Sequence, residues 1–309
     1  MVKEKLQKLI NELKINPHNH EKRKQLAFLL IELDAFEDAI KQLNFLLTVE
    51  PENAVLYYKS AIAHSELNNF KKAEQAYLKA IEFAPNDPDY PYNLASLYDK
   101  NGDIEKAIEY YYLTLDLDSM DANSHFNLAL LYIKKEDNEQ AISHLKEAIC
   151  LNPNDVYAYF YLANIMQKID DDEAALENYE KVIELNPEYS WAYYNLGCLA
   201  LKYNEIKKAK EYFVKTIQTN PKDIQTVRIL TALALQENNA EWALEFVNYF
   251  LQNNEITGDL NVTLAQIYQK MGNKSKVIEN LEQALNHYKT LTIPIDAVKH
   301  SLAQLRKDS

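Results

Sequence analysis

The chain has 309 residues, 47% of them hydrophobic, and a formal net charge of −13 at pH 7. It contains only four glycines, which disfavours the glycine-rich loop that cradles nucleotide phosphates. Residues 51–200 hold 26 acidic and 11 basic side chains. This balance opposes nucleic-acid binding, which depends on Lys and Arg side chains that neutralise phosphates.

The N-terminal segment, residues 1–17, combines charged residues with leucines at helical spacing and predicts a lone amphipathic helix. It lacks the uninterrupted apolar stretch of a secretory signal peptide. No later segment offers roughly eighteen consecutive apolar residues, the length that a membrane-spanning helix needs. We therefore expect a cytoplasmic protein without membrane insertion.

After this helix, prolines recur at a spacing of 34 residues, with one position taken by Ser119. The prolines on this spacing are Pro17, Pro51, Pro85, Pro153, Pro187 and Pro221. A fixed period of this length is typical of a solenoid built from stacked helix pairs. Each proline is expected to end the second helix of a pair, because it lacks the backbone donor and clashes with the preceding turn.

Within each period the apolar residues predict two amphipathic helices separated by a short break. The breaks contain residues that tolerate the left-handed conformation at the end of a helix. They fall at Asn68–Asn69, Asn101–Asp103, Glu136–Asn138, Asp170–Asp172, Tyr203–Asn204, Asn238–Asn239 and Gly272–Asn273. Small residues at positions 61, 95, 129, 163 and 197 predict close helix approach, and large residues at 77, 111, 145, 179 and 213 are expected to fill the remaining space.

Helix pairs of 34 residues with small residues at these places closely resemble the tetratricopeptide repeat. The motif reads Tyr57, Ala61, Ala73, Tyr77, Ala80 and Pro85 in one repeat, and Tyr193, Leu196, Gly197, Ala209, Phe213 and Pro221 in another. The resemblance implies an all-α, right-handed superhelical solenoid of antiparallel helix pairs. We expect one continuous domain over residues 1–309, with about eight repeats starting near residues 20, 54, 88, 122, 156, 190, 224 and 258.

The repeat pattern weakens toward the two ends, where one face of a solenoid meets solvent. Thr231 replaces the small residue of the seventh repeat. Residues 294–307 place Val298, Leu302 and Leu305 on one helical face and predict a capping helix.

The first helices of such repeats line a concave groove in the family, and an aromatic residue recurs at one position of five successive first helices. This aromatic series is Tyr58, Tyr92, Phe126, Phe160 and Tyr194. Aromatic side chains provide large contact area at low entropic cost, so the series is a candidate anchor for an extended peptide. The alternative is that these rings pack against neighbouring helices and form part of the core.

One residue further on, an asparagine series consists of Asn93, Asn127 and Asn195. A carboxamide both donates and accepts hydrogen bonds and therefore suits the holding of a peptide backbone. The series resembles the asparagine ladder of peptide-binding superhelices, and hydrogen bonds between repeats are the alternative role. Tyr157 and Trp191 are expected to widen the aromatic surface. Lysines recur near the ends of four first helices, at Lys100, Lys134, Lys168 and Lys202. They are candidates for a basic rim that binds acidic groups of a ligand, and favourable interaction with the helix dipole is the alternative.

No catalytic or metal-binding pattern occurs in the sequence. The seven histidines lack a metal-ligand spacing, and Cys150 and Cys198 are isolated thiols. We therefore expect no catalytic residues, metal or cofactor, and predict a non-catalytic scaffold or adaptor whose partner is a protein or extended peptide. A self-assembling structural scaffold, or an accessory subunit of a separate enzyme such as a glycosyltransferase, is the alternative.

Overall fold

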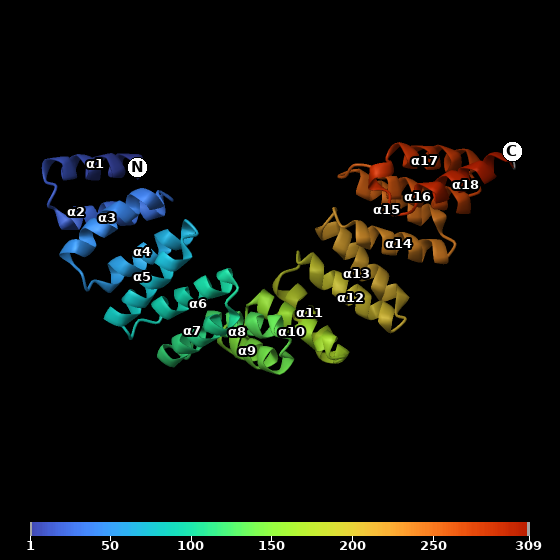
Figure 1. The fold of residues 1–309 in the computed structure, drawn as a ribbon. Coiled ribbons are helices and arrows are strands. Elements are labelled where there is room, and N and C mark those ends of the chain that lie inside the picture. The colour runs from blue at the N-terminus through green and yellow to red at the C-terminus, as the bar shows by residue number, and fades with distance from the viewer. Residues whose placement is uncertain (1, 308–309) are drawn as a thin grey trace. The chain divides into compact units, whose positions relative to one another are not determined.

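The computed structural model describes residues 2–307, and within them every regular element is helical (Figure 1). Residues 1, 308 and 309 of the predicted 1–309 domain lie outside the described part. The α-helices are α1 (Val2–Ile15), α2 (His20–Glu32), α3 (Phe36–Val49), α4 (Ala54–Glu66), α5 (Phe70–Phe83), α6 (Asp89–Asn101), α7 (Ile104–Leu117), α8 (Ala122–Lys134), α9 (Asn138–Leu151), α10 (Val156–Lys168), α11 (Asp172–Leu185), α12 (Ser190–Lys202), α13 (Ile206–Thr219), α14 (Ile224–Gln236), α15 (Ala240–Leu251), α16 (Gly258–Lys270), α17 (Lys274–Asn286) and α18 (Ile295–Lys307). A short 3₁₀ helix, η1 (Tyr288–Thr290), precedes α18. None of these helices is long and apolar enough to cross a bilayer.

The helices follow one another as pairs, and the predicted all-α solenoid of helix pairs is confirmed. First helices begin at His20, Ala54, Asp89, Ala122, Val156, Ser190, Ile224 and Gly258. The chain divides into two compact units, unit 1 (Met1–Ala158) and unit 2 (Tyr159–Ser309), and the division falls inside α10. The expectation of one continuous domain stays a prediction.

The turn inside each pair is closed by one residue in the left-handed backbone conformation. These residues are Asp34, Asn68, Gly102, Glu136, Asp170, Asn204, Asn238 and Gly272, with φ between 56° and 83°. All but Asp34 lie at the breaks expected from the sequence. Left-handed geometry ends a helix because it redirects the last backbone donors onto orphaned carbonyls. Asn, Asp and Gly tolerate this conformation best, so Glu136 is the unusual member.

Small and large side chains alternate between the two helices of each pair, as expected. Ala61, Ala95, Ala129 and Ala163 have no exposed surface, and the large side chains opposite them are also buried. In unit 2 the small residue at this position is a glycine. A β-carbon built on Gly197 of α12 would lie 2.6 Å from the Phe213 ring of α13. Only glycine therefore fits at this position without displacing the ring.

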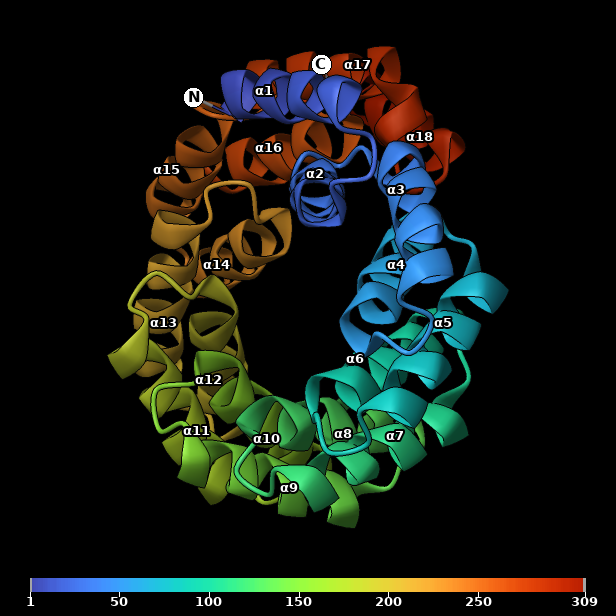
Figure 2. The same cartoon turned by 90° about the vertical axis from the view of Figure 1, so that its left-hand side faces the viewer.

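Each unit presents a first-helix face and a second-helix face. In Figure 2, α12 and α14 lie on one side of unit 2, and α11, α13 and α15 lie on the other. Contacts between side chains one repeat apart agree with this arrangement. Asn195 of α12 donates to Asn164 of α10, whereas Lys210 of α13 lies over the ring of Trp242 of α15.

Candidate peptide-binding surface

The aromatic series lies partly buried along the first helices and contacts the second helix of its own pair. Four of its rings lie 5.6–6.1 Å from a second-helix ring, measured between centroids. The pairs are Tyr58–Tyr77, Tyr92–Tyr111, Phe160–Tyr179 and Tyr194–Phe213. The fifth member, Phe126, is also partly buried. These rings therefore contribute to the core while keeping part of their surface accessible.

Burial raises the pKa of the three tyrosines of this series. It is the main cause for Tyr58, Tyr92 and Tyr194, with carboxylates or the Cys198 thiol as further causes. Their hydroxyl groups therefore stay protonated at neutral pH and act as neutral hydrogen-bonding groups.

The asparagine series joins neighbouring repeats inside each unit. In unit 1, Nδ2 of Asn93 donates to the Tyr58 hydroxyl (3.2 Å), and Nδ2 of Asn127 donates to the Tyr92 hydroxyl (3.1 Å). In unit 2, Nδ2 of Asn195 lies 3.4 Å from Oδ1 of Asn164, which also accepts from the Tyr179 hydroxyl. The amide nitrogens are therefore used between repeats, and each carboxamide is held in a defined orientation.

Tyr157 and Trp191 differ from the other eight predicted residues because most of their surface is exposed. Tyr157 is 59% exposed and Trp191 is 60% exposed. Trp191 contacts Tyr194 edge to face, with ring centroids 6.3 Å apart. In unit 2 the structure thus brings together an exposed indole, a half-buried phenol ring and, next to Tyr194 in sequence, the Asn195 carboxamide.

The recurring lysines at first-helix ends include two that form ion pairs. Lys134 lies 2.6 Å from Asp99, and Lys202 lies 2.5 Å from Asp172 and 3.3 Å from Asp170. Bonds from Lys202 and the Tyr203 hydroxyl lower the pKa of Asp172. Both lysines are therefore neutralised by carboxylates of the preceding repeat. The carboxylates of Asp170 and Asp172 act as the partners of Lys202.

Comparison with family models agrees with this repeat architecture over most of the chain. Tetratricopeptide repeat models match residues 26–91, 76–109, 192–223 and 258–286, and a TPR repeat model matches residues 130–170 and 171–202. The chain belongs to the tetratricopeptide repeat family. Comparison with curated proteins found no match.

Solved structures of other tetratricopeptide repeat proteins share the fold. A crystal structure of MamA is 25% identical, with a TM-score of 0.52 over 57% of this chain and 96% of that chain. YrrB, described as a TPR protein with an unusual peptide-binding site, is 22% identical, with a TM-score of 0.53 over 60% and 96%. The C-terminal part of a TPR repeat-containing protein from Cytophaga hutchinsonii is 17% identical, with a TM-score of 0.58 over 87% and 96%.

Sequence reasoning missed a hydrogen-bonded network between two repeats of this tetratricopeptide repeat protein. Nδ1 of His144 lies 3.0 Å from Nδ1 of His125, and Nε2 of His144 lies 3.0 Å from the Tyr112 hydroxyl. Tyr112 in turn bonds the Tyr132 hydroxyl at 3.1 Å. Burial, followed by the neighbouring His125, lowers the pKa of His144 to about 4. The signal for this network was a polar residue directly before Leu145, inside a second helix.

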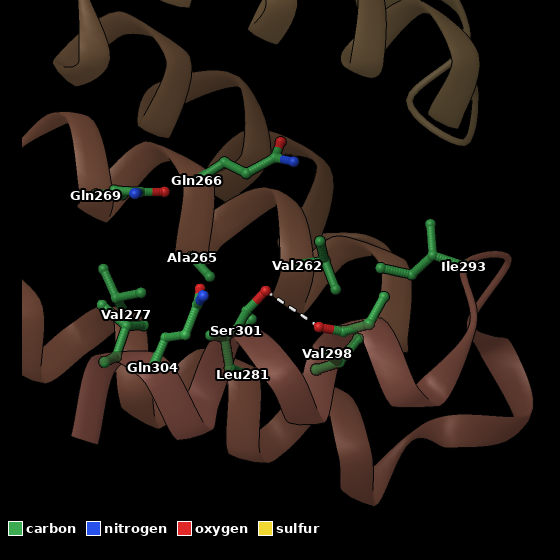
Figure 3. A pocket seen from close by; sticks show the side chains of 12 residues that line it. Val262, Ala265, Gln266, Gln269, Val277, Leu281, Ile293, Val298, Ser301 and Gln304 are labelled. Carbon is green, nitrogen blue, oxygen red and sulfur yellow. Dashed lines mark hydrogen bonds between the residues drawn. The ribbon is translucent and has the colours of Figure 1, made fainter. Parts of the chain in front are cut away.

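A pocket of about 450 Å³ lies at the C-terminal end of the repeats, between α16, α17 and α18 (Figure 3). Apolar side chains, including Val277, Leu281 and Val298, form its base, and Gln266, Gln269 and Gln304 also line it. The Ser301 hydroxyl is already used, because it donates to the Ala297 carbonyl within α18 (3.1 Å). Among the described residues, no group of three or more His, Cys, Asp or Glu side chains is arranged to hold a metal ion.

Proposed function

We propose that this tetratricopeptide repeat protein is a non-catalytic scaffold that holds extended peptide segments of partner proteins on its first-helix faces. The asparagine series carries the proposal. Its Nδ2 atoms are fixed by the preceding repeat, and no hydrogen bond of the described residues uses Oδ1 of Asn93 or Asn127. A carbonyl oxygen held in this way is suited to accept from the N–H of a peptide backbone.

The partly exposed aromatic rings next to these carboxamides supply contact area for side chains of the peptide. In unit 2, the 60% exposed Trp191 offers the largest such surface. Tyrosine and tryptophan concentrate binding energy in interfaces, because they bury much area while losing little conformational freedom. The fold is shared with YrrB, which is itself described as having a peptide-binding site. The cytoplasmic location stays a prediction.

The proposal is tested by selecting binders for the full-length protein from a random peptide library and measuring affinities by calorimetry. Trp191→Ala is expected to lower the affinity for peptides that bind unit 2 by roughly 30-fold or more. This corresponds to the loss of about 2 kcal/mol of binding free energy that is typical of an aromatic anchor. The double variant Asn93→Ala with Asn127→Ala should lower the affinity for peptides that bind unit 1, without loss of helicity.

Matched controls come from exposed residues that the proposal does not use. Tyr288→Ala removes an aromatic side chain that is 52% exposed, and Gln140→Ala removes an exposed carboxamide from the second helix α9. Both should leave peptide affinity unchanged. Equal losses in the controls, or selected peptides that ignore Trp191 and the asparagine series, would contradict the proposal.

A further inference from the structure

The pocket of Figure 3 adjoins a second pocket of unit 2. The second pocket, of about 310 Å³, is lined by residues of α14 and α16 and by Thr292 and Ile293, which precede α18. Val262, Gln266 and Ile293 line both pockets. We call the two pockets together the C-terminal trough, which runs from α14 across α16 to α18.

The trough continues the face of unit 2 that carries Tyr194 of the aromatic series. Arg228 of α14 and Val262 of α16 stand at the same repeat position as Tyr194 of α12, one and two repeats further along the chain. Both residues line the trough. A peptide that is anchored at Trp191 of α12 and follows the repeats toward the C-terminus therefore reaches the trough.

The trough has no net charge, although the whole chain has a formal net charge of −13. Among the described residues, the only charged ones in its lining are Arg228 and Asp259, which form an ion pair at 2.8 Å. The other carboxylate oxygen of Asp259 accepts from the Thr292 N–H (2.7 Å). A charged ligand group would lose its water here without meeting an unpaired opposite charge, which is unfavourable.

Three carboxamides of the trough are available to a ligand. Gln266 and Gln269 of α16 and Gln304 of α18 are exposed, and within residues 2–307 none of their side chains forms a hydrogen bond. Figure 3 shows that they reach the pocket from these two helices. A carboxamide both donates and accepts, so it can pair with the N–H and C=O of a peptide unit whatever the side chain.

Apolar groups of the trough are accessible beside these carboxamides. Ile293, which both pockets share, is 39% exposed, and Val277, Leu281 and Val298 form the buried base of the pocket in Figure 3. Pockets of about 300–1,000 Å³ accept drug-sized ligands, so this pocket has room for the side chain of a leucine or phenylalanine.

We propose that the C-terminal trough selects an uncharged, extended segment of the partner peptide. The glutamines hold the backbone of this segment, and one of its apolar side chains enters the pocket beside α18. The inference rests on the proposed function and adds the chemistry of the partner. Packed helices lie about 8–10 Å apart, so a path from α12 to α18 takes roughly nine extended residues.

Three peptide libraries test the proposal on the full-length protein. Each contains random peptides of about twelve residues with acetylated and amidated ends, which removes the terminal charges. The first library contains only uncharged residues, and the other two add one Glu or one Lys at a random position. The protein should retain the uncharged library about tenfold better than either of the others. A retained peptide should shift the methyl NMR signals of Ile293, which the variant Ile293→Val assigns.

Variants of the trough should lower the affinity for these retained peptides, as measured by calorimetry. Ala297→Phe fills the pocket of Figure 3 from α18 and is expected to lower the affinity about tenfold. The double variant Gln266→Ala with Gln304→Ala should lower it several-fold. Gln269→Glu places a carboxylate beside the pocket and should change the preference toward the library that contains Lys. Circular dichroism checks that every variant remains helical.

Matched controls come from the same unit. Ala297 and Ala303 are both exposed on α18, but only Ala297 lines the trough, so Ala303→Phe should keep the wild-type affinity. Gln218→Ala, which removes an exposed carboxamide from the second helix α13, should keep it as well.

The outcomes separate this inference from the proposed function. Retained peptides that lose affinity with Trp191→Ala but leave the Ile293 signals unchanged would overturn the inference and leave the function intact. Equal retention of the three libraries, or equal losses with Ala297→Phe and Ala303→Phe, would also overturn the inference alone. If no peptide of any library binds, the proposed function fails together with it.

Discussion

His144 is a buried side chain whose two ring nitrogens are both used in hydrogen bonds, to His125 and Tyr112. A neutral imidazole has one donor and one acceptor, so it satisfies both contacts without a net charge. Protonation would place a second donor among His125, Tyr112 and Tyr132, and the nearby Glu147 carboxylate offsets this only in part. The contact between the repeats formed by α7, α8 and α9 is therefore more stable when His144 is neutral.

This preference predicts that the protein loses stability in mild acid. The pKa of His144 is about 4 in the folded chain, compared with about 6.5 when unfolded. Between these values the unfolded chain binds the extra proton, so the free energy of unfolding should decrease as the pH falls from about 6.5 to about 4, by at most about 3 kcal/mol. Urea denaturation across this range measures the loss.

His144→Gln should remove most of the pH dependence contributed by this residue. His300→Gln, which changes an exposed histidine of α18, should retain the wild-type profile. If the wild type and His144→Gln lost stability in parallel, the network would have no role in the acid response.

At the scale of elements, α18 covers the apolar surface that the last helix pair would otherwise expose. Val298 and Leu302 are buried and pack in one cluster with Val277 and Leu281 of α17. The opposite side of α18 is polar, as expected of a terminal cap. The pocket of Figure 3 beside this cluster shows that α18 covers the last pair without filling all of the space between α16 and α17.

Replacement of both apolar contacts, Val298→Asp with Leu302→Asp, should detach α18. Burying a carboxylate without a partner is strongly unfavourable, so a loss of about 3 kcal/mol or more is expected at this end of the chain. Hydrogen exchange should become faster in α17 and α16. Lys299→Asp with Gln304→Asp changes exposed positions of the same helix and should have little effect.

The helix pairs were predictable from the sequence because they depend on local chemistry. Asn68, Gly102 and Asn204 tolerate positive φ wherever they stand, and a 34-residue recurrence of small residues identifies the close helix contacts. The candidate site was less predictable. The bond from Asn127 to Tyr92 joins residues 35 positions apart, and it depends on side-chain rotamers that periodicity does not encode. For the same reason, periodicity did not predict the contact between His125 and His144.

At the scale of the whole molecule, a repeat array responds locally to a change, because each pair contacts mainly its neighbours. Gly197→Ala places a methyl group against Phe213 and should destabilise unit 2 by about 1–3 kcal/mol. Hydrogen exchange measured by mass spectrometry should accelerate in residues 190–250, whereas residues 20–110 keep the wild-type rates. The double variant Gly197→Ala with Phe213→Leu should recover part of the loss, and uniform acceleration along the chain would contradict local response.

The chain contains two tryptophans, Trp191 in α12 and Trp242 in α15, and these two helices lie on opposite sides of unit 2 in Figure 2. Trp191 is largely exposed, whereas Trp242 lines a pocket of about 710 Å³ between α12, α13 and α15, where the Lys210 ammonium lies over its ring. Variants that keep only one of the two tryptophans therefore give a fluorescence signal from one site at a time. With Trp242→Phe, emission and iodide quenching report only on events at Trp191, and with Trp191→Phe they report only on events at the pocket that Trp242 lines. Peptide binding at Trp191 and changes beside Trp242 can thus be followed separately in one protein, without an attached dye.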